Sequence, residues 1–298
     1  MHGRVETSAS TPARQSLAPT TEIGIVKLTV ASTARSQTFY EQALGLVASR
    51  AANGVLRLGA KGGETLIEVH EDASAQALDR RKTGLFHLAI LFPSRAELAR
   101  ALRRLGEARW PLEGASDHLV SEALYLSDPD GNGIELYRDR AREDWPRSNG
   151  QIQMATLPLD LRDLLDEVGD HGAGETGAPR ETKIGHIHLQ VSELEQSEDF
   201  YSGLLGFDVT VRGYPGALFL SAGGYHHHIG LNTWNSAGAA PPAPDAIGLR
   251  EYEIVLSDDK ALEGVRKRIS AASAPFEASD EGLRVRDPSG NRLLLRFA

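Results

Sequence analysis

The chain has 298 residues, 41% hydrophobic and 24% charged, which is enough for one large domain or two ordinary domains with a hydrophobic core. Its formal net charge of -9 argues against nucleic acid as a partner, because duplex-binding surfaces usually carry a basic excess. Since the chain has no cysteine, disulfides, thiolate metal sites and cysteine nucleophiles are excluded, and any metal must be bound by His, Asp or Glu.

The chain begins with a polar segment, residues 1–21, that is rich in Ser and Thr and lacks the apolar stretch of a signal peptide. We expect this segment to be a disordered tail. Further along, no apolar run approaches the roughly 20 residues that a membrane span needs. We therefore expect no membrane contact and a cytoplasmic location.

An internal repeat organises the remainder of the chain. Residues 23–45 align without a gap with residues 184–206, through IGIVKLTV and IGHIHLQV, then FY, then LG in both. In the same way, GLFHLAIL resembles GLREYEIVL, and SDPDGNGIELY resembles RDPSGNRLLLRF. Such self-similarity indicates one supersecondary unit used several times. The predicted units lie at about 22–72, 83–140, 183–235 and 247–298.

Each unit has the same predicted order of elements. It opens with an alternating apolar strand and continues with a helical pattern, which in the second unit is SRAELARALRRLG. There we expect Ser94 to cap the helix and Gly106 to end it. The unit then returns as strands joined by turns such as DPDGN and DPSGN. The order is therefore βαβββ.

These modules predict an α+β fold in which paired modules form two half-barrel domains. We expect one domain of modules 1 and 2 (22–140) and one of modules 3 and 4 (183–298). Between them, residues 141–182 contain a short amphipathic piece, LPLDLRDLLDEV, followed by the Gly-rich stretch GDHGAGETGAP. That composition is typical of a linker with a short helix.

The concave face of such a sheet can hold a ligand, and the opening and last strands of each module should face it. The opening-strand position carries Ile25, His87, His186 and Glu251, and the last-strand position carries Glu68, Glu135, Gly230 and Leu294. Two imidazoles and one carboxylate, from His87, His186 and Glu135, match the facial triad that binds Fe(II) and leaves coordination positions open.

Each of these three residues alone has a simpler interpretation. A single strand histidine is more often a hydrogen-bonded structural residue, and a single glutamate is more often a surface carboxylate. However, Glu135 lies between Ile134 and Leu136 and so points opposite to both. The equivalence of the three positions under the repeat favours a metal site.

Three further groups could contribute to the same cavity. Tyr225 precedes three histidines, His226–His228, one of which could act as an acid–base group, although such a run can also be a soluble strand end. The segment Ser116–Ser121 leads to Tyr125, with ordinary hairpin chemistry as the alternative. Asn232 and Trp234 could close one end of the cavity or serve in packing.

At these residues the sequence resembles the vicinal-oxygen-chelate superfamily, which includes glyoxalase I, bleomycin-resistance proteins and type I extradiol dioxygenases. The resemblance covers nearly the whole chain from about residue 22 and is greatest for the catechol-2,3-dioxygenase branch. DPDGNGIELY alone marks only the superfamily. The resemblance to this branch is more specific when five phrases are taken together: GLFHLAI, SDHLVSEALYLSDPDGNGIELYRDR, IGHIHLQV, FYSGLLGF and GYHHHIGLNTW.

The resemblance implies a role for each residue. The triad of His87, Glu135 and His186 would bind Fe(II), or Mn(II) as in some members. His227 lies three residues before Gly230 and matches the histidine that such enzymes use as an acid–base group.

Two more matches lie in the second module. Tyr125, ten residues before Glu135, matches the tyrosine that contacts substrate, and His118 matches a further active-site histidine. We assign substrate contacts to His228, Asn232 and Trp234.

One departure from the family pattern concerns the placement of the ligands. Many two-domain extradiol enzymes hold the metal entirely in their last two modules, but here the fourth module has Glu251 and Leu294 in place of His and Glu. The site must then join module 2 to module 3, and modules 1 and 4 would form a metal-free partner.

The implied function is cleavage of a small aromatic diol with O2 by an extradiol dioxygenase. A glyoxalase-like lyase or isomerase is one alternative, but its second carboxylate would fall on Gly230. A non-catalytic small-molecule-binding protein of the bleomycin-resistance type is another, although it needs no metal ligands. The expected partners are the diol and O2, without nucleic acid or membrane, and a homo-oligomer is compatible with this interpretation.

Overall fold

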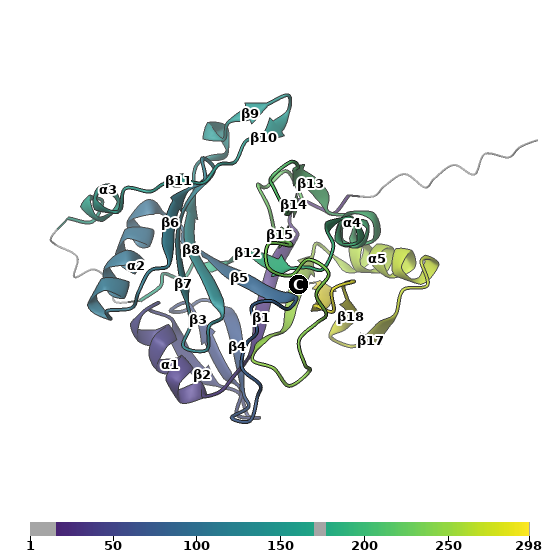
Figure 1. Ribbon diagram of the computed structural model, residues 1–298, viewed down its shortest axis with the longest axis horizontal. Coiled ribbons are helices and arrows are strands. Elements are labelled where there is room, and N and C mark those ends of the chain that lie inside the picture. Colours follow the sequence, from purple (N-terminus) through teal and green to yellow (C-terminus); the bar gives the residue numbers. More distant parts are fainter. Residues whose placement is uncertain (1–15, 170–176, 298) are drawn as a thin grey trace, which may run out of the picture.

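The computed structural model describes residues 16–169 and 177–297, and it confirms the four βαβββ modules (Figure 1). Module 1 comprises β1 (Glu22–Val30), α1 (Thr33–Gln42), β2 (Val47–Arg50), β3 (Leu56–Gly59) and β4 (Thr65–Glu71). Module 2 comprises β5 (Gly84–Leu91), α2 (Arg95–Glu107), β6 (Gly114–Asp117), β7 (Ser121–Ser127) and β8 (Gly133–Asp139).

The second half repeats this order. Module 3 comprises β12 (Lys183–Gln190), α4 (Leu194–Glu198) continuing as the π-helix η2 (Asp199–Leu205), β13 (Asp208–Val211), β14 (Ala217–Ser221) and β15 (Ile229–Asn232). Module 4 comprises β16 (Gly248–Leu256), α5 (Asp259–Ala271), β17 (Phe276–Ser279), β18 (Gly282–Arg286) and β19 (Arg292–Phe297). Helices α1 and α2 lie on one side of the molecule and α4 and α5 on the other (Figure 1).

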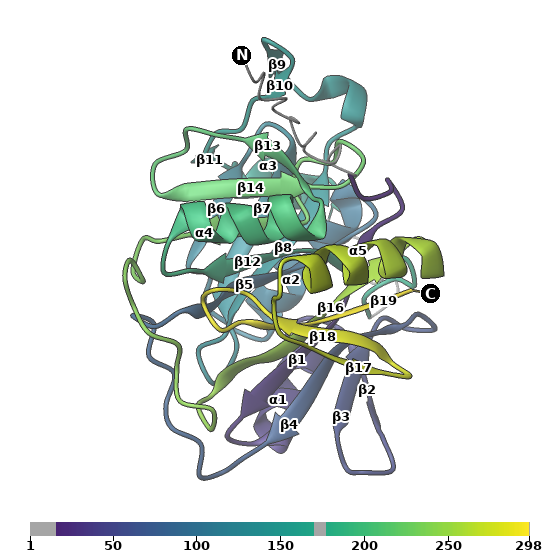
Figure 2. The same cartoon turned by 90° about the vertical axis from the view of Figure 1, so that its right-hand side faces the viewer.

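Each of the two large sheets combines modules from both halves of the chain. The order β17-β18-β19-β16-β1-β4-β3-β2 joins module 4 to module 1, and β11-β6-β7-β8-β5-β12-β15-β14-β13 joins module 2 to module 3. The junctions are the antiparallel pairs β1–β16 and β5–β12, and within each module the opening strand runs parallel to the last. Figure 2 shows the two sheets one above the other, with α4 and α5 in front of them.

Bulges bend both junctions at matching places. Between β5 and β12 the register steps from the pair His87–His188 to the pair Leu85–Leu189, so that Phe86 is an extra residue. Between β1 and β16 the equivalent step leaves out Arg250. A bulge re-aims the neighbouring side chains, and Phe86 and His87 consequently both reach the same cavity.

Helix α2 follows its sequence signals at the start but not at the end. The Ser94 side chain accepts a hydrogen bond from the Glu97 N–H, as expected of a cap. The predicted stop at Gly106 is wrong, because the helix continues to Glu107. The turn instead closes at Arg109, whose φ is 53°, while the Trp110 N–H donates to the Leu105 carbonyl.

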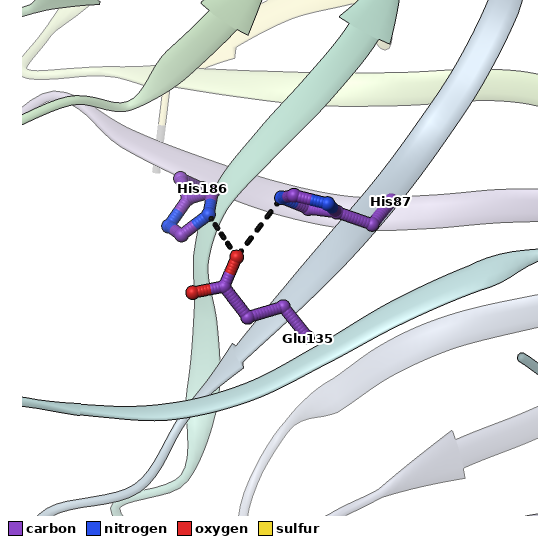
Figure 3. Close-up of side chains that lie close together, drawn as sticks. All are labelled: His87, Glu135 and His186. Carbon is purple, nitrogen blue, oxygen red and sulfur yellow. Dashed lines mark hydrogen bonds and ion pairs between the residues drawn. The ribbon is translucent and has the colours of Figure 1, made fainter. Parts of the chain in front are cut away.

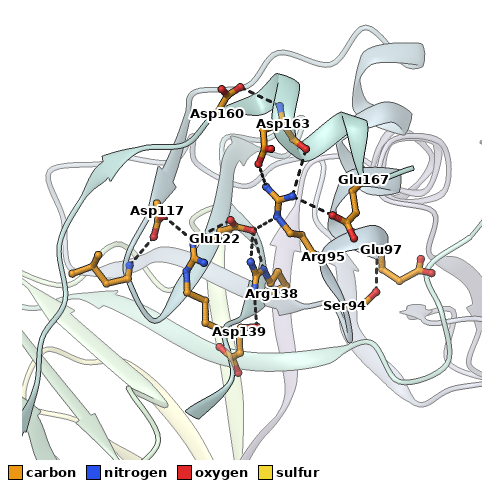
Figure 4. Close-up of polar contacts among 12 residues, drawn as sticks. Ser94, Arg95, Glu97, Asp117, Glu122, Arg138, Asp139, Asp160, Asp163 and Glu167 are labelled. Atoms are coloured by element: carbon orange, nitrogen blue, oxygen red, sulfur yellow. Dashed lines mark hydrogen bonds and ion pairs between the residues drawn. The ribbon is translucent and has the colours of Figure 1, made fainter. Parts of the chain in front are cut away.

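Ion pairs hold the connection between modules 2 and 3 to the sheet. It contains the 3-10 turn η1 (Arg142–Asp144), β9 (Arg147–Ser148), β10 (Gln151–Ile152), β11 (Leu157–Pro158) and α3 (Leu161–Asp166). The Arg95 guanidinium links Glu122 of β7 to Asp163 of α3 (Figure 4). Glu122 is buried but has three guanidinium partners, from Arg95, Arg138 and Arg140, which offset its loss of hydration.

Parts of the expected tail and linker lie outside the described residues, namely 1–15 and 170–176. Residues 16–21, the end of the expected tail, pack against module 3. There Leu17 is buried in the core, and its N–H donates to the Gly206 carbonyl. Among the described residues, no helix has the length and apolar character needed to cross a membrane.

Candidate metal centre

Three side chains from three adjacent strands converge on the concave face of the sheet of modules 2 and 3. His87 comes from β5, Glu135 from β8 and His186 from β12, and one potential ligand atom of each lies within 4.8 Å of the others (Figure 3). The alternation of β8 explains the aim of Glu135, because its neighbours Ile134 and Leu136 lie in the hydrophobic core.

Both imidazoles approach the same carboxylate oxygen. Glu135 Oε2 lies 2.9 Å from His87 Nε2 and 3.2 Å from His186 Nε2. Two ligand atoms each about 2.1 Å from one ion and at right angles to each other would be about 3 Å apart. The buried Nε2 of His87 has no aligned hydrogen-bond partner among the described residues, although it lies this close to the carboxylate.

The electrostatics of the cluster suit a cation. Burial lowers the pKa of His186 to about 4, which leaves a neutral imidazole at pH 7. Burial alone would raise the pKa of Glu135, but the imidazoles of His186 and His87 hold it well below its usual range. Two imidazoles and one carboxylate are the donor set of a facial triad. Within residues 16–169 and 177–297, no second cluster of three metal-ligating side chains is found.

A cavity of about 340 Å³ opens beside these ligands and has His87 and Glu135 in its wall. Its apolar lining includes the rings of Phe86, Tyr214, Phe219 and Trp234, and its polar lining includes His118, Tyr125, His188 and His227. A largely apolar wall with a few convergent polar groups is typical of a small-molecule site.

The positions of His118 and Tyr125 determine the direction of their hydrogen bond. His118 Nδ1 lies 2.7 Å from the Ala155 carbonyl, which can only accept, so this nitrogen carries the proton. In the neutral ring Nε2 is then an acceptor, and it lies 2.7 Å from the Tyr125 hydroxyl, which donates to it. Burial, followed by the nearby Glu135 carboxylate, raises the pKa of Tyr125 well above its usual value, which keeps the phenol protonated.

The three consecutive histidines face different surroundings. His227 lines the cavity, with its ring centroid 4.1 Å from that of His186. His226 is fully buried and contacts Asp139. His228 accepts a hydrogen bond from the Ala222 N–H through Nδ1.

Of the three residues assigned to substrate contact, one lines the cavity and two do not. Trp234 lines the cavity and donates from Nε1 to the Pro215 carbonyl. His228 and Asn232 do not line it, which corrects their expected placement. The ring of His228 is directed to the backbone of Ala222, and Asn232 uses its Oδ1 to accept from the Trp234 N–H.

His188 is a cavity residue that the sequence analysis did not identify. It is buried, and its Nε2 has no hydrogen-bond partner among the described side and main chains. The alternation in IGHIHLQV could have indicated it, because residues two apart on a strand share a face. Its ring lies over Gly230, where a Cβ would come within 2.9 Å of it. A carboxylate at residue 230 would therefore collide with His188.

Comparison with known proteins gives the same family from sequence and fold. The family described as Glyoxalase/Bleomycin resistance protein/Dioxygenase superfamily matches residues 22–136 and 183–295. The chain is 46% identical over 272 residues to a protein named catechol-2,3-dioxygenase from Bacillus subtilis (strain 168), covering 90% of this chain and 94% of that protein.

Two solved structures have a similar fold. A putative dioxygenase from Bacillus subtilis subsp. subtilis str. 168 matches with a TM-score of 0.61 and 14% identity, over 95% of this chain and 86% of that one. Glyoxalase I from Zea mays matches with a TM-score of 0.57 and 16% identity, over 92% of each chain. At such identities the likeness concerns the fold alone.

Proposed function

This chain belongs to the Glyoxalase/Bleomycin resistance protein/Dioxygenase superfamily, and from that premise we propose that it is an extradiol dioxygenase that opens a catechol-like ring with O2. Its 46% identity to a protein named catechol-2,3-dioxygenase supports this reaction. The observation that carries the proposal is the convergence of His87, Glu135 and His186 beside a cavity of suitable size for a single aromatic ring.

The metal that we propose is Fe(II), with Mn(II) as the alternative, held by His87, Glu135 and His186. When bound, such an ion acidifies a coordinated diol and provides a path for electrons between the diol and O2. Three protein ligands leave coordination positions for both substrates. Fe(II) is preferred because the donor set is that of the non-haem Fe(II) oxygenases.

The residues of the chain would bind the diol and handle its protons. Burial, and then the neighbouring imidazoles, lower the pKa of His227 well below its usual value, so it is neutral at pH 7 and can accept a proton from a substrate hydroxyl. Tyr125 also lines the cavity, donates to His118 and keeps its own oxygen available to accept. The apolar rings exclude water from the reacting group.

The glyoxalase-like alternative lacks the ligand that it requires. Its metal would need a second carboxylate at residue 230, where the chain has Gly230 and the His188 ring occupies the space that a side chain would fill. The alternative of a non-catalytic binding protein does not account for a buried cluster of metal ligands in the cavity wall.

Oxygen consumption is the direct test of the proposed reaction. The chain, purified without oxygen and loaded with Fe(II), should consume one O2 per catechol and give a ring-opened semialdehyde. A panel of catechols, hydroquinones and protocatechuate would define the substrate. The matched control is Glu135→Ala under the same loading. If the iron-loaded protein consumed no O2 with any diol, the proposed function would be wrong.

The remaining partners also stay predictions. We propose a small aromatic diol and O2 as substrates, a cytoplasmic location, and no nucleic-acid or membrane partner. Size-exclusion chromatography with light scattering would show whether the protein is a monomer or a homo-oligomer.

A further inference from the structure

Behind His227, a short series of hydrogen bonds leads from the cavity wall to the end of strand β8. His227 Nδ1 lies 2.8 Å from His226 Nδ1, and His226 Nε2 lies 2.8 Å from Asp139 Oδ1. The His226 ring is fully buried, and the Asp139 side chain is one-quarter exposed. The imidazole of His226 therefore bridges a carboxylate near the surface and the cavity histidine.

The chemistry of these atoms sets the direction of each bond. A carboxylate only accepts, so His226 carries a proton on Nε2, toward Asp139. When this is the one proton of the His226 ring, its Nδ1 is an acceptor, and the proton in the bond between the two histidines belongs to His227 Nδ1. In a neutral His227 ring, Nε2 is left with a lone pair.

The second oxygen of Asp139 is also held. The Tyr225 hydroxyl lies 2.9 Å from Asp139 Oδ2 and donates to it, and the Tyr137 hydroxyl, 2.8 Å away, then donates to Tyr225. Tyr137 reaches this place by crossing Gly185 of β12, where a Cβ would lie 1.7 Å from the tyrosine oxygen. The carboxylate is thus oriented by two tyrosines as well as by the imidazole.

We propose that Asp139 and His226 are positioning residues that fix the tautomer of His227, with its proton on Nδ1 and its lone pair on Nε2. His227 then meets the substrate as a proton acceptor, without first having to exchange tautomers. The use of this tautomer in catalysis depends on the proposed dioxygenase function, but the tautomer itself does not. Partners of this kind fix ring orientation and tautomer at other histidine sites.

The tautomer can be measured without turnover. In the full chain labelled with ¹⁵N-histidine and loaded with diamagnetic Zn(II), the nitrogen shifts of His227 should show a protonated Nδ1 and an unprotonated Nε2. In Asp139→Ala, His226 loses its acceptor, so both tautomers of His227 should appear. In His226→Gln, an amide N–H can face Asp139 and the amide oxygen can accept from His227, so the original tautomer should persist.

Turnover with Fe(II) provides the second measurement. Asp139→Ala should lower kcat for catechol about 10- to 100-fold, the usual range for losing a partner that orients a histidine, with KM changed less than about threefold. His226→Gln should retain most of kcat. The control His70→Asn, a histidine substitution in module 1, should change neither measurement.

The outcomes separate this inference from the proposed function. A single unchanged tautomer of His227 in Asp139→Ala would overturn the inference, even if the protein were an active dioxygenase. Equal loss of kcat in Asp139→Ala and in a thermally stable His226→Gln would also overturn it, since only the first variant removes the acceptor. The expected tautomers in a protein without dioxygenase activity would leave the inference standing and refute the function.

Discussion

The two large sheets derive from one repeat, yet they use the same concave positions for different purposes. In the sheet of modules 2 and 3, the carboxylate of Glu135 contacts the imidazoles of His87 and His186. In the sheet of modules 1 and 4, the ammonium of Lys27 lies 2.8 Å from Glu251 and 3.8 Å from Glu253.

Guanidinium groups also pair with the carboxylates in the sheet of modules 1 and 4. Glu251 also pairs with Arg284, Glu253 with Arg296, and Glu68 with Arg57. Both concave faces thus gather carboxylates, but on one they pair with ammonium and guanidinium groups, and on the other Glu135 lies between two imidazoles. We therefore expect a carboxylate that is paired with Lys or Arg to bind a metal less readily than one that lies between imidazoles.

The largest expected effect comes from removing the glutamate at equivalent positions of the two sheets. Glu135→Ala should weaken metal binding more than about 100-fold, beyond the cost of losing an outer-shell partner, and abolish turnover. Glu68→Ala, the matched variant in module 1, should keep both. Metal content after dialysis and oxygen uptake measure the outcome. Equal metal retention in the two variants would remove the distinction between the sheets.

A smaller loss of activity is expected for His227→Phe. This variant removes an acid–base group but none of the three proposed ligands, so it should retain the metal and lower kcat by about 100-fold or more. Metal analysis and steady-state kinetics on the same sample separate the two effects. An unchanged kcat would remove the role assigned to His227.

The internal cation of the other sheet is expected to affect stability alone. Lys27→Met removes the ammonium partner of Glu251 and Glu253 but leaves their arginine partners, so it should lower the free energy of unfolding by about 1 to 3 kcal/mol and leave metal content and kcat unchanged. Urea denaturation measures the first quantity. A large loss of bound metal would mean that the two faces are coupled.

The smallest expected effect is a difference in stability between substitutions of two glycines at equivalent positions of the repeat. A Cβ on Gly185 would meet the buried, hydrogen-bonded hydroxyl of Tyr137 at 1.7 Å, whereas on Gly24 it would meet the side chain of Glu253 at 2.9 Å. Overpacking costs about 1 to 3 kcal/mol, so Gly185→Ala should lie at the upper end of this range and Gly24→Ala at the lower end. Thermal and urea denaturation test the order, and a reversed order would contradict it.

Strand alternation and the repeat were sufficient to predict most of the fold and the three proposed ligands. His87, Glu135 and His186 lie on regular strands, where position along the chain determines the face of the sheet. For these three residues to meet, module 2 had to share a sheet with module 3, although the linker suggested a domain boundary between the two modules. The strand order shows that these modules do share a sheet.

Irregular backbone limited the rest of the prediction. His227 and His228 follow a turn after β14, where no periodicity distinguishes a side chain in the cavity from one outside it. Phe86 reaches the cavity because of a bulge that its sequence does not reveal. Asp139 is separated from His226 by 87 residues and contacts it only through the tertiary fold, so no local pattern could have paired them.

Because each sheet combines modules from both halves of the chain, dividing the gene between the two halves has a practical consequence. A break in the segment between β8 and β12 would give two polypeptides, each with two strands stripped of their antiparallel neighbours: β1 and β5 in the first, β12 and β16 in the second. Such bare strand edges favour aggregation. Neither polypeptide should be soluble by itself, whereas synthesis of both in one cell should reconstitute the protein by fragment complementation.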